Sequence, residues 1–398
     1  MAADSTGSNT PSRAVFWRDP SKRALIFQFI VFALAAWFVW VIVDNTATNM
    51  RNRGVATGFG FLDIQAGFGI IQSLIPYSEA SSYGRAFWVG LCNTLLVAIV
   101  GIVLATVLGF LVGIARLSPN WLLAKVATVY VETFRNIPLL LQIFFWYSAV
   151  LKPLPGPRSL HEAGDQVFFS VNNRGVVMAE PVFGAGFSWV LWALLAALAG
   201  TWFIRRWARR RQEKTGQPFP VLLTGLALVF GLPLLAFLLT GMPLHFEPAQ
   251  MSRFSLRGGV TIIPELIALL LALVVYTAAF IAEIVRAGIQ SVSHGQSEAA
   301  QALNLSPGQA LRLVIIPQAL RVIIPPLTSQ YLNLTKNSSL ATAIAYPDLV
   351  SVFAGTVLNQ TGQAVEVMAI TLAVYLLLSL LTSMFMNWYN HRIRLVER

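Results

Sequence analysis

Apolar blocks of bilayer length recur along this chain, and they limit its possible folds more than any other feature. A helix needs about 20 apolar residues to cross a hydrocarbon core of about 30 Å. Eight segments meet that requirement: residues 24–43, 86–113, 125–151, 187–204, 220–240, 260–284, 317–339 and 364–387. Since only helices and closed barrels satisfy their backbone hydrogen bonds in lipid, we expect an all-α polytopic membrane protein with about eight transmembrane helices.

Composition supports a membrane protein. Charged residues make up only 11% of the chain, whereas a soluble protein carries about 25%. The net charge of +11 is compatible with nucleic-acid binding, but the basic residues flank the apolar blocks. We therefore interpret the basic run of residues 205–211 as an orientation signal with some attraction to anionic lipid, and we expect no nucleic-acid partner.

The histidines give no sign of a metal site. They are scattered over loops without the spacing of metal ligands, so we expect no metal and no cofactor. The four residues are His161, His245, His294 and His391.

The distribution of Lys and Arg between alternate loops predicts how the chain is oriented in the membrane. With the N-terminus inside, the cytoplasmic segments hold 17 Lys and Arg residues and the opposite segments hold 8. Both termini are therefore expected to be cytoplasmic. Residues 24–43 form an apolar block longer than the hydrophobic region of a typical signal peptide, so we interpret this segment as a retained anchor.

Two stretches resemble additions to a smaller membrane unit. Residues 1–85 supply one anchor helix and an outer, periplasmic loop, and residues 152–259 supply periplasmic loops and a helical hairpin with a basic turn. Without them, residues 86–151 and 260–398 form a predicted core of five helices.

The most specific motif lies in a predicted cytoplasmic loop of about residues 290–317. Two capping boxes organise this loop, one from Ser293 with Gln296 and one from Ser306 with Gln309. Between them, Asn304 stands where a left-handed residue has to end the first helix. We therefore predict two short helices joined by a tight turn. The first presents small side chains that would let another protein approach closely: Ala299, Ala300 and Ala302.

This loop resembles the EAA loop of the permease subunits of binding-protein-dependent ABC importers, the loop that docks into the ATPase. The residues that carry the resemblance are Gly295, Glu298, Ala299, Ala300, Asn304, Pro307 and Pro317. Asn304 stands where the family has Gly, and Asn also enters the left-handed region. The flanking segments 132–142, 279–289 and 317–340 are similar to the histidine, glutamine and polar amino-acid permeases. With the additions at 1–85 and 152–259, the chain is most similar to a membrane subunit of the general L-amino-acid importer of Gram-negative bacteria.

The resemblance implies a location in the bacterial inner membrane and a set of partners. These are a second homologous permease subunit, two copies of an ABC ATPase, a periplasmic amino-acid-binding protein and the amino-acid substrate. ATP hydrolysis is expected in the partner, and this chain is not expected to be an enzyme. A P-loop needs Gly immediately before its Lys, and none of the five lysines follows Gly.

Ionisable residues within an apolar segment are costly and usually functional. Glu132 and Arg135 are three residues apart, about 10–15 Å into their segment at 1.5 Å per residue. Asn136 and Pro138 predict a break in the helix there. Two roles are open for Arg135. It either holds the substrate carboxylate or a gate of the path, or it forms an ion pair with Glu132 that stabilises the broken helix. Ion pairing is the commoner outcome for buried charges.

The candidates for the translocation path are Glu132, Arg135, Asn136 and Gln142, together with a second polar cluster, Lys336, Asn337 and Ser338. The second cluster either lines the path or lies at the outer lip, where Lys extends its charge to water. Glu283 and Arg286, also three apart, are interpreted as a structural pair beside the docking loop.

An ion- or proton-coupled secondary carrier is the alternative function. Such carriers often contain paired internal repeats and acidic residues near the midplane of the membrane. No half-to-half repeat is obvious here, and Glu132 is the only carboxylate well inside a segment. The sequence therefore favours a permease that depends on a separate ATPase.

Overall fold

The computed structural model describes residues 20–52, 54, 57–253 and 255–393. Both chain termini, which were predicted to be cytoplasmic, lie outside these residues. Within the described residues, seven helical segments are long and apolar enough to cross a membrane, and a bent pair makes an eighth. The all-α polytopic fold is thus confirmed. Its long helices are α1 Pro20–Asn52, α2 Tyr83–Ala115, α6 Phe187–Thr215, α7 Val221–Leu239, α8 Pro264–Gln290, α11 Ile316–Asn337 and α13 Ala364–Ile393.

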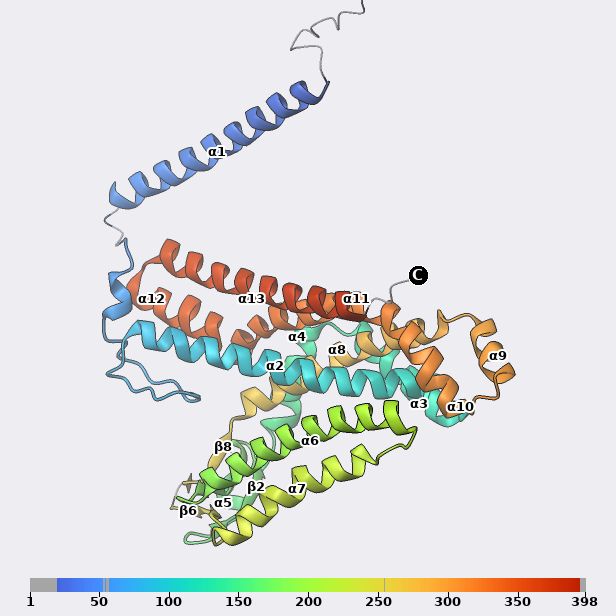
Figure 1. Ribbon diagram of the computed structural model, residues 1–398. Helices are drawn as coiled ribbons and strands as arrows, with labels where there is room; N and C mark the ends of the chain where they lie inside the picture. Colours follow the sequence, from blue (N-terminus) through green and yellow to red (C-terminus); the bar gives the residue numbers. More distant parts are fainter. Residues whose placement is uncertain (1–19, 53, 55–56, 254, 394–398) are drawn as a thin grey trace, which may run out of the picture.

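The long helices from α2 onward run between two ends of the molecule, and α1 lies apart from them (Figure 1). At one end the short helices α9 (His294–Ala302) and α10 (Pro307–Ala310) connect α8 to α11, with a π-helical segment, Leu311–Ile315, before α11. At the other end lie short strands and α5 (Pro157–Leu160). Further short elements are the 3₁₀ helices Gly60–Asp63 and Ser338–Ile344, the π-helical segment Val350–Val357 and α12 Leu358–Thr361.

Helix α8 lies at the centre of the core, where α2, α3 (Trp121–Asn136) and α11 pack against it. The contact with α2 is close because α2 presents glycine. A methyl group added at Gly109 would lie 2.6 Å from Cβ of Ile281, and one at Gly113 would lie 2.8 Å from Cβ of Val285. Small residues allow helix backbones to approach in lipid, where packing rather than the hydrophobic effect drives association. These glycines therefore fix where α2 crosses α8.

Predicted segment 125–151 is not one straight helix. Helix α3 (Trp121–Asn136) begins four residues earlier, where Asn120 accepts hydrogen bonds from the backbone N–H groups of Leu122 and Leu123. It meets the following helix, α4 (Leu139–Phe144) with the π-helical segment Phe145–Leu151, at a bend of 106°. The predicted break before Pro138 is confirmed.

Short β-strands in and beside the 152–259 stretch were not predicted. They form three antiparallel sheets among the described residues. The first contains β1 (Gln166–Val167), β6 (Ala249–Met251) and β7 (Leu256–Arg257), and the second contains β2 (Phe169–Asn172), β3 (Gly175–Met178) and β8 (Val260–Ile262). The third pairs β4 (Glu180–Phe183) with β5 (Leu244–Glu247). Strands of two to four residues are too short to show an alternating pattern. Most of their partners also lie across the α6–α7 hairpin in sequence.

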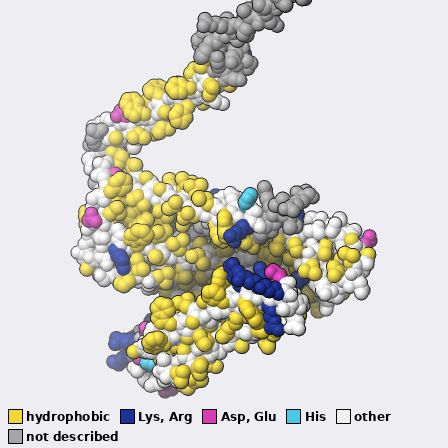
Figure 2. Space-filling view, in the orientation of Figure 1, with side chains coloured by type: hydrophobic (Ala, Val, Ile, Leu, Met, Phe, Trp, Pro, Cys, Tyr) yellow, Lys and Arg dark blue, Asp and Glu magenta, His cyan; other side chains and the backbone are white. Residues whose placement is uncertain are grey.

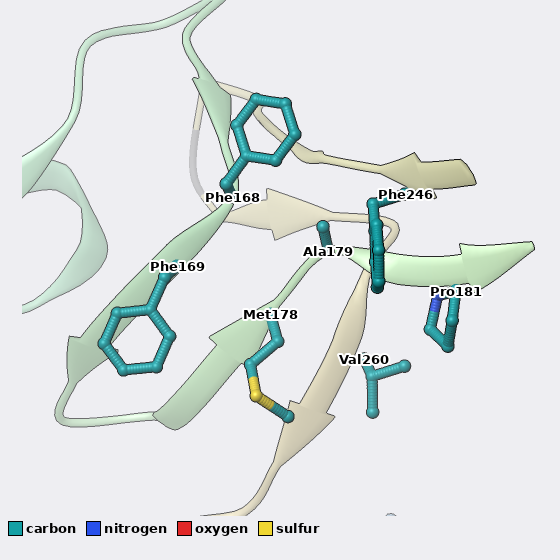
Figure 3. Close-up of a pocket in the computed structure, with 7 residues that line it drawn as sticks. All are labelled: Phe168, Phe169, Met178, Ala179, Pro181, Phe246 and Val260. Atoms are coloured by element: carbon teal, nitrogen blue, oxygen red, sulfur yellow. The ribbon is translucent and has the colours of Figure 1, made fainter. Parts of the chain in front are cut away.

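Cross-strand pairs in these sheets leave an apolar hollow of about 520 Å³ open to the surface (Figure 3). Phe169 pairs with Met178, which in turn pairs with Val260, and Pro181 pairs with Phe246. The sheets thus hold large apolar side chains outside the long helices.

The α6–α7 hairpin corrects one detail of the sequence interpretation. Predicted segment 187–204 stops at the basic run, but α6 continues to Thr215 and ends at Gly216 with φ 71°. The basic run of residues 205–211 is therefore helical, and the turn of the hairpin follows it. Arg and Lys are good helix formers, so the charges end the apolar segment without ending the helix.

Candidate functional site: the docking loop and the polar clusters of the core

The loop between α8 and α11 ends its first helix with a left-handed residue, as predicted. Asn304 has φ 57°. Its N–H donates to the carbonyl of Gln301 at 2.8 Å, and the N–H of Leu305 donates to the carbonyl of Ala300 at 3.1 Å. These two bonds form a Schellman motif, which satisfies carbonyls that a helix end leaves free. Asn304 thus performs the conformational role that Gly has in the family.

Only one of the two predicted capping boxes forms. Ser306 accepts a hydrogen bond from the N–H of Gln309 at 3.4 Å, and the Gln309 side chain accepts from the N–H of Ser306 at 2.9 Å. Ser293 precedes α9, but its side chain makes no capping bond. The Gln296 side chain instead accepts from Gln318 of α11 at 3.2 Å. The box at Ser293 was wrong because Gln296 is used to tie α9 to α11.

The small residues of α9 do not share one environment. Ala300 is buried, with 2% of its surface exposed, so it packs inside the loop rather than facing another protein. This corrects the expectation for Ala300. The outward face, which we call the docking face, carries Gly295, Glu298, Ala299, Ala302 and Leu303, all exposed. Leu303 has 76% of its surface exposed, which is unusual for an apolar residue in an otherwise polar loop.

Pro307 and Pro317 hold the second part of the loop in helical form. Pro307 stands at the start of α10, where its missing N–H costs nothing, whereas Pro317 follows the π-helical segment at the beginning of α11. The π-helical segment between them joins α10 to α11 without a break, so residues Pro307–Ile344 form one continuous helical span. The loop is therefore continuous with α11.

A charged cluster lies where α8 approaches the loop. Its hub is the carboxylate of Glu283, which accepts hydrogen bonds from Arg116, just after α2, and from Arg286 on α8. The predicted Glu283–Arg286 pair is confirmed. Arg135 of α3 lies 3.9 Å from the same carboxylate, and its guanidinium also lies over the Phe280 ring, 5.2 Å from the centroid. One carboxylate thus links α2, α3 and α8.

The predicted Glu132–Arg135 ion pair is wrong. Both residues belong to the described part of the chain, yet Glu132 faces Arg116 at 3.9 Å while Arg135 faces Glu283. Arg116 follows the last residue of α2. Glu132, with 60% of its side chain exposed, lies beside helix ends and not well inside a span. These partners come from α2 and α8, so spacing within α3 alone could not identify them.

Asn136 and Gln142 bond to the backbone around the bend in the 121–151 segment. Gln142 is almost completely buried, and its side-chain amide donates to the carbonyls of Phe134 and Ile137, both at 3.0 Å. Asn136 donates to the carbonyl of Glu132 at 2.6 Å. A bend frees backbone carbonyls that lipid cannot satisfy, so Gln142 stabilises the bend.

Lys336 lines a hollow of about 460 Å³ between the end of α11 and α13. Most of its wall is apolar, and hydroxyl groups are added by Ser339, Thr371, Tyr375 and Ser379. Among the described residues, no carboxylate lies within ion-pair distance of Lys336. Its positive charge is therefore free for an anionic ligand.

The other members of the predicted 336–338 cluster are separated from Lys336. Ser338 is fully buried and donates to the carbonyl of Thr335 at 2.7 Å, while Asn337 is half-buried. The sequence analysis missed Asp348. This fully buried carboxylate accepts from the N–H of Ser351 at 2.8 Å and from the Tyr375 hydroxyl at 3.4 Å, so it orients a wall of the hollow. Its one sequence signal is a carboxylate after Pro347 in an otherwise apolar segment.

Long apolar helices, a loop of short helices between two of them and a lysine beside a hollow are the features of a polytopic membrane transport component. Residues 101–395 match the family of binding-protein-dependent transport system inner membrane components, and the chain belongs to that family. It is a transport subunit and not an enzyme.

Similar proteins match the chain over almost its whole length. The general L-amino acid transport system permease protein AapQ of Rhizobium johnstonii is 54% identical over 96% of this chain and 94% of its own length. The putative amino-acid ABC transporter permease protein YhdX of Escherichia coli is 54% identical over 98% of this chain and 99% of its own. The glutamate/glutamine/aspartate/asparagine transport system permease protein BztB of Rhodobacter capsulatus is 44% identical, with 96% of each chain covered.

Proposed function

We propose that this chain forms part of the translocation path of an ATP-driven amino-acid importer in the bacterial inner membrane. The observation that carries the proposal is the docking face of α9, which is exposed and small or apolar except for Glu298. It is joined through short connections to two spanning helices. Such a face suits a groove in an ATPase. The names of the three relatives support an amino-acid substrate.

The proposed assembly contains this chain, a second homologous permease subunit, two copies of an ABC ATPase and a periplasmic amino-acid-binding protein. Residues 86–151 and 260–398 form the proposed core, with 1–85 and 152–259 as additions. Both termini and the docking loop are proposed to be cytoplasmic, as the Lys and Arg distribution favours.

In the proposed cycle, ATP binding and hydrolysis move the docking loop, and the movement tilts α8 and α11. Glu283 passes the motion of α8 to Arg116 and Arg135, and hence to α2 and α3. Shifting the permease from 1:99 to 99:1 between two states requires about 5.5 kcal/mol of differential binding. We therefore propose that Arg135 and Gln142 maintain the linkage between helices, that the largely exposed Glu132 and Asn136 add little to it, and that none of the four binds substrate.

The substrate contact is proposed at Lys336. Its ammonium group would pair with the α-carboxylate of an amino acid. The hydroxyl groups of Ser339 and Tyr375, whose protons go to the carbonyl of Lys336 and to Asp348, would accept hydrogen bonds from the α-ammonium group. The apolar wall suits side chains of different shapes. Asn337 and Ser338 would position Lys336 at the end of α11.

Reconstitution in vesicles tests the proposal. The chain, its sister subunit and the ATPase, with binding protein added outside, should take up labelled L-amino acids only when ATP is supplied on the ATPase side. Uptake by this chain alone, driven by a proton or sodium gradient, would support the secondary carrier instead. ATP hydrolysis without any uptake of amino acids would contradict the proposed substrate class.

A further inference from the structure

One face of α6 is apolar along most of its length and basic at its end. The apolar part consists of four residues three or four positions apart, each with about half or more of its surface exposed: Leu191, Leu195, Leu198 and Trp202. The same spacing continues into Arg205, Arg206 and Arg209. Because residues three and four apart share a helix face, these seven side chains form one continuous stripe, which we call the lipid face.

A neighbouring side of α6 is already occupied. Thr201 lies against Gly225 of α7, where an added methyl group would meet its Cγ2 at 2.9 Å. Ala197 and Ala208 share that side by spacing and are buried. The contact with α7 therefore leaves the lipid face uncovered.

The basic end of the lipid face surrounds a hollow of about 380 Å³, lined by Trp202, Arg205, Arg206 and Arg209. The Arg206 guanidinium lies over the Trp202 ring, 5.7 Å from its centroid. Among the described residues, none of the three arginines has a carboxylate within ion-pair distance. Three converging guanidinium groups without a counter-charge form a site for a phosphate group.

The surroundings of this site are apolar. Figure 2 shows Lys and Arg side chains gathered on the α6–α7 hairpin at the edge of the hollow that separates the hairpin from the rest of the helices. Apolar side chains are exposed on other helices too, among them Val103, Val107 and Leu111 of α2. A phosphate bound here would therefore lie next to surfaces that need an apolar cover.

The dimensions match one leaflet of a bilayer. From Leu191 to Trp202 the face is about 16 Å long at 1.5 Å per residue, which is roughly half of a hydrocarbon core of about 30 Å. Trp202 then stands at the level where Trp is enriched, the membrane interface. The arginines follow at the level of the headgroups.

We propose that the lipid face binds an anionic phospholipid, with its phosphate held by Arg205, Arg206 and Arg209 and its acyl chains along Leu191–Trp202. The inner leaflet follows from the orientation proposed above. The bound lipid fills part of the space between the α6–α7 hairpin and the core, and it ties the two together. The free charges and the length of the apolar face together select a phospholipid over a soluble anion.

The test is lipid retention by the assembled complex, measured by native mass spectrometry after purification in an equimolar mixture of phosphatidylglycerol and phosphatidylcholine. The wild type should retain phosphatidylglycerol selectively. The triple variant Arg205→Gln, Arg206→Gln, Arg209→Gln should retain less by on the order of tenfold. The control triple Arg210→Gln, Arg211→Gln, Lys214→Gln removes the same charge from other sides of α6 and should retain it as the wild type does.

Three results would overturn the proposal. Equal retention of the two lipids by the wild type would show no selectivity for anionic lipid, even if the glutamine variant fails to assemble. Equal losses of phosphatidylglycerol in the two glutamine triple variants would mean that the lipid is held only by the general attraction between basic residues and anionic lipid. Displacement of the lipid by excess inorganic phosphate would indicate a site for a soluble anion. The variant Arg205→Lys, Arg206→Lys, Arg209→Lys keeps the orientation signal and should keep the lipid. Retention as low as in the glutamine variant would be a fourth contrary result, because three positive charges would then hold no more lipid than three neutral side chains.

Discussion

Arg116, the residue that follows α2, donates to the carboxylate of Glu283 on α8, and only 10% of the Arg116 side chain remains exposed. Because Arg135 and Arg286 lie around the same carboxylate, Glu283 balances three cations from three helices. The contact lies at the end of the helices that is nearest to the docking loop. Removing the negative charge therefore affects both the stability of the core and its link to the loop.

We expect Glu283→Gln to destabilise the purified complex by about 2 kcal/mol, the cost of losing hydrogen bonds between charged groups. Transport should fall more than ATP hydrolysis, because the link between loop and core is weakened. Glu132→Gln is the control, since this largely exposed carboxylate lies 3.9 Å from Arg116. Thermal unfolding and the ratio of uptake to hydrolysis provide the measurement, and equal behaviour of both variants would rule out Glu283 as the hub.

Gln142 should be essential to the bend between α3 and α4. Gln142→Leu keeps the volume but leaves the carbonyls of Phe134 and Ile137 without a donor, at a cost of about 1–3 kcal/mol. Asn136→Ala removes an exposed side-chain bond in the same region and should change stability by less than about 0.5 kcal/mol. Thermal unfolding of the two variants, each compared with the wild type, tests this difference in stability. A stable Gln142→Leu protein would mean that other groups donate hydrogen bonds to the carbonyls at the bend.

The docking face predicts different results at neighbouring alanine positions. Ala299→Trp and Leu303→Glu should leave the permease stable but reduce the amount of ATPase that copurifies with it. Ala300→Trp should instead destabilise the loop itself, by about 1–3 kcal/mol, because Ala300 is packed inside it. Full retention of ATPase and normal uptake by Ala299→Trp would show that α9 docks through another face.

Asn304 is expected to tolerate Gly but not a branched residue. Asn304→Gly removes the side-chain penalty of the left-handed backbone at φ 57°, so transport should be kept or slightly increased. Asn304→Val should cost about 1–2 kcal/mol through the same backbone. Uptake and unfolding temperature of the two variants test this, and a fully active Val variant would exclude a conformational role.

Lys336 should determine apparent affinity for substrate. Lys336→Gln should raise the KM of uptake by roughly 10- to 100-fold, the range expected for one lost charge-assisted bond. Lys336→Arg should preserve most of the affinity. Lys152→Gln is the matched control, because Lys152 lies over the Tyr147 ring and not at the hollow. An unchanged KM in Lys336→Gln would place the carboxylate contact elsewhere.

The sequence by itself determined the polytopic helical fold, the break before Pro138, the left-handed Asn304 and the Glu283–Arg286 pair. Each depends on residues close in sequence: runs of apolar residues, a proline, a helix end and an i,i+3 spacing. Periodicity and capping report on such local features directly. The family resemblance rested on equally local motifs.

Only the tertiary structure decided which residues meet across helices. Glu132 faces Arg116 rather than Arg135, Gln142 bonds to carbonyls on the far side of a bend, and Ala300 is buried while Ala299 is exposed. The bend of 106° and the close approach of α2 to α8 at Gly109 set these contacts. Spacing along one helix gives the face of a residue, but the partner of that face depends on where the other helices cross it.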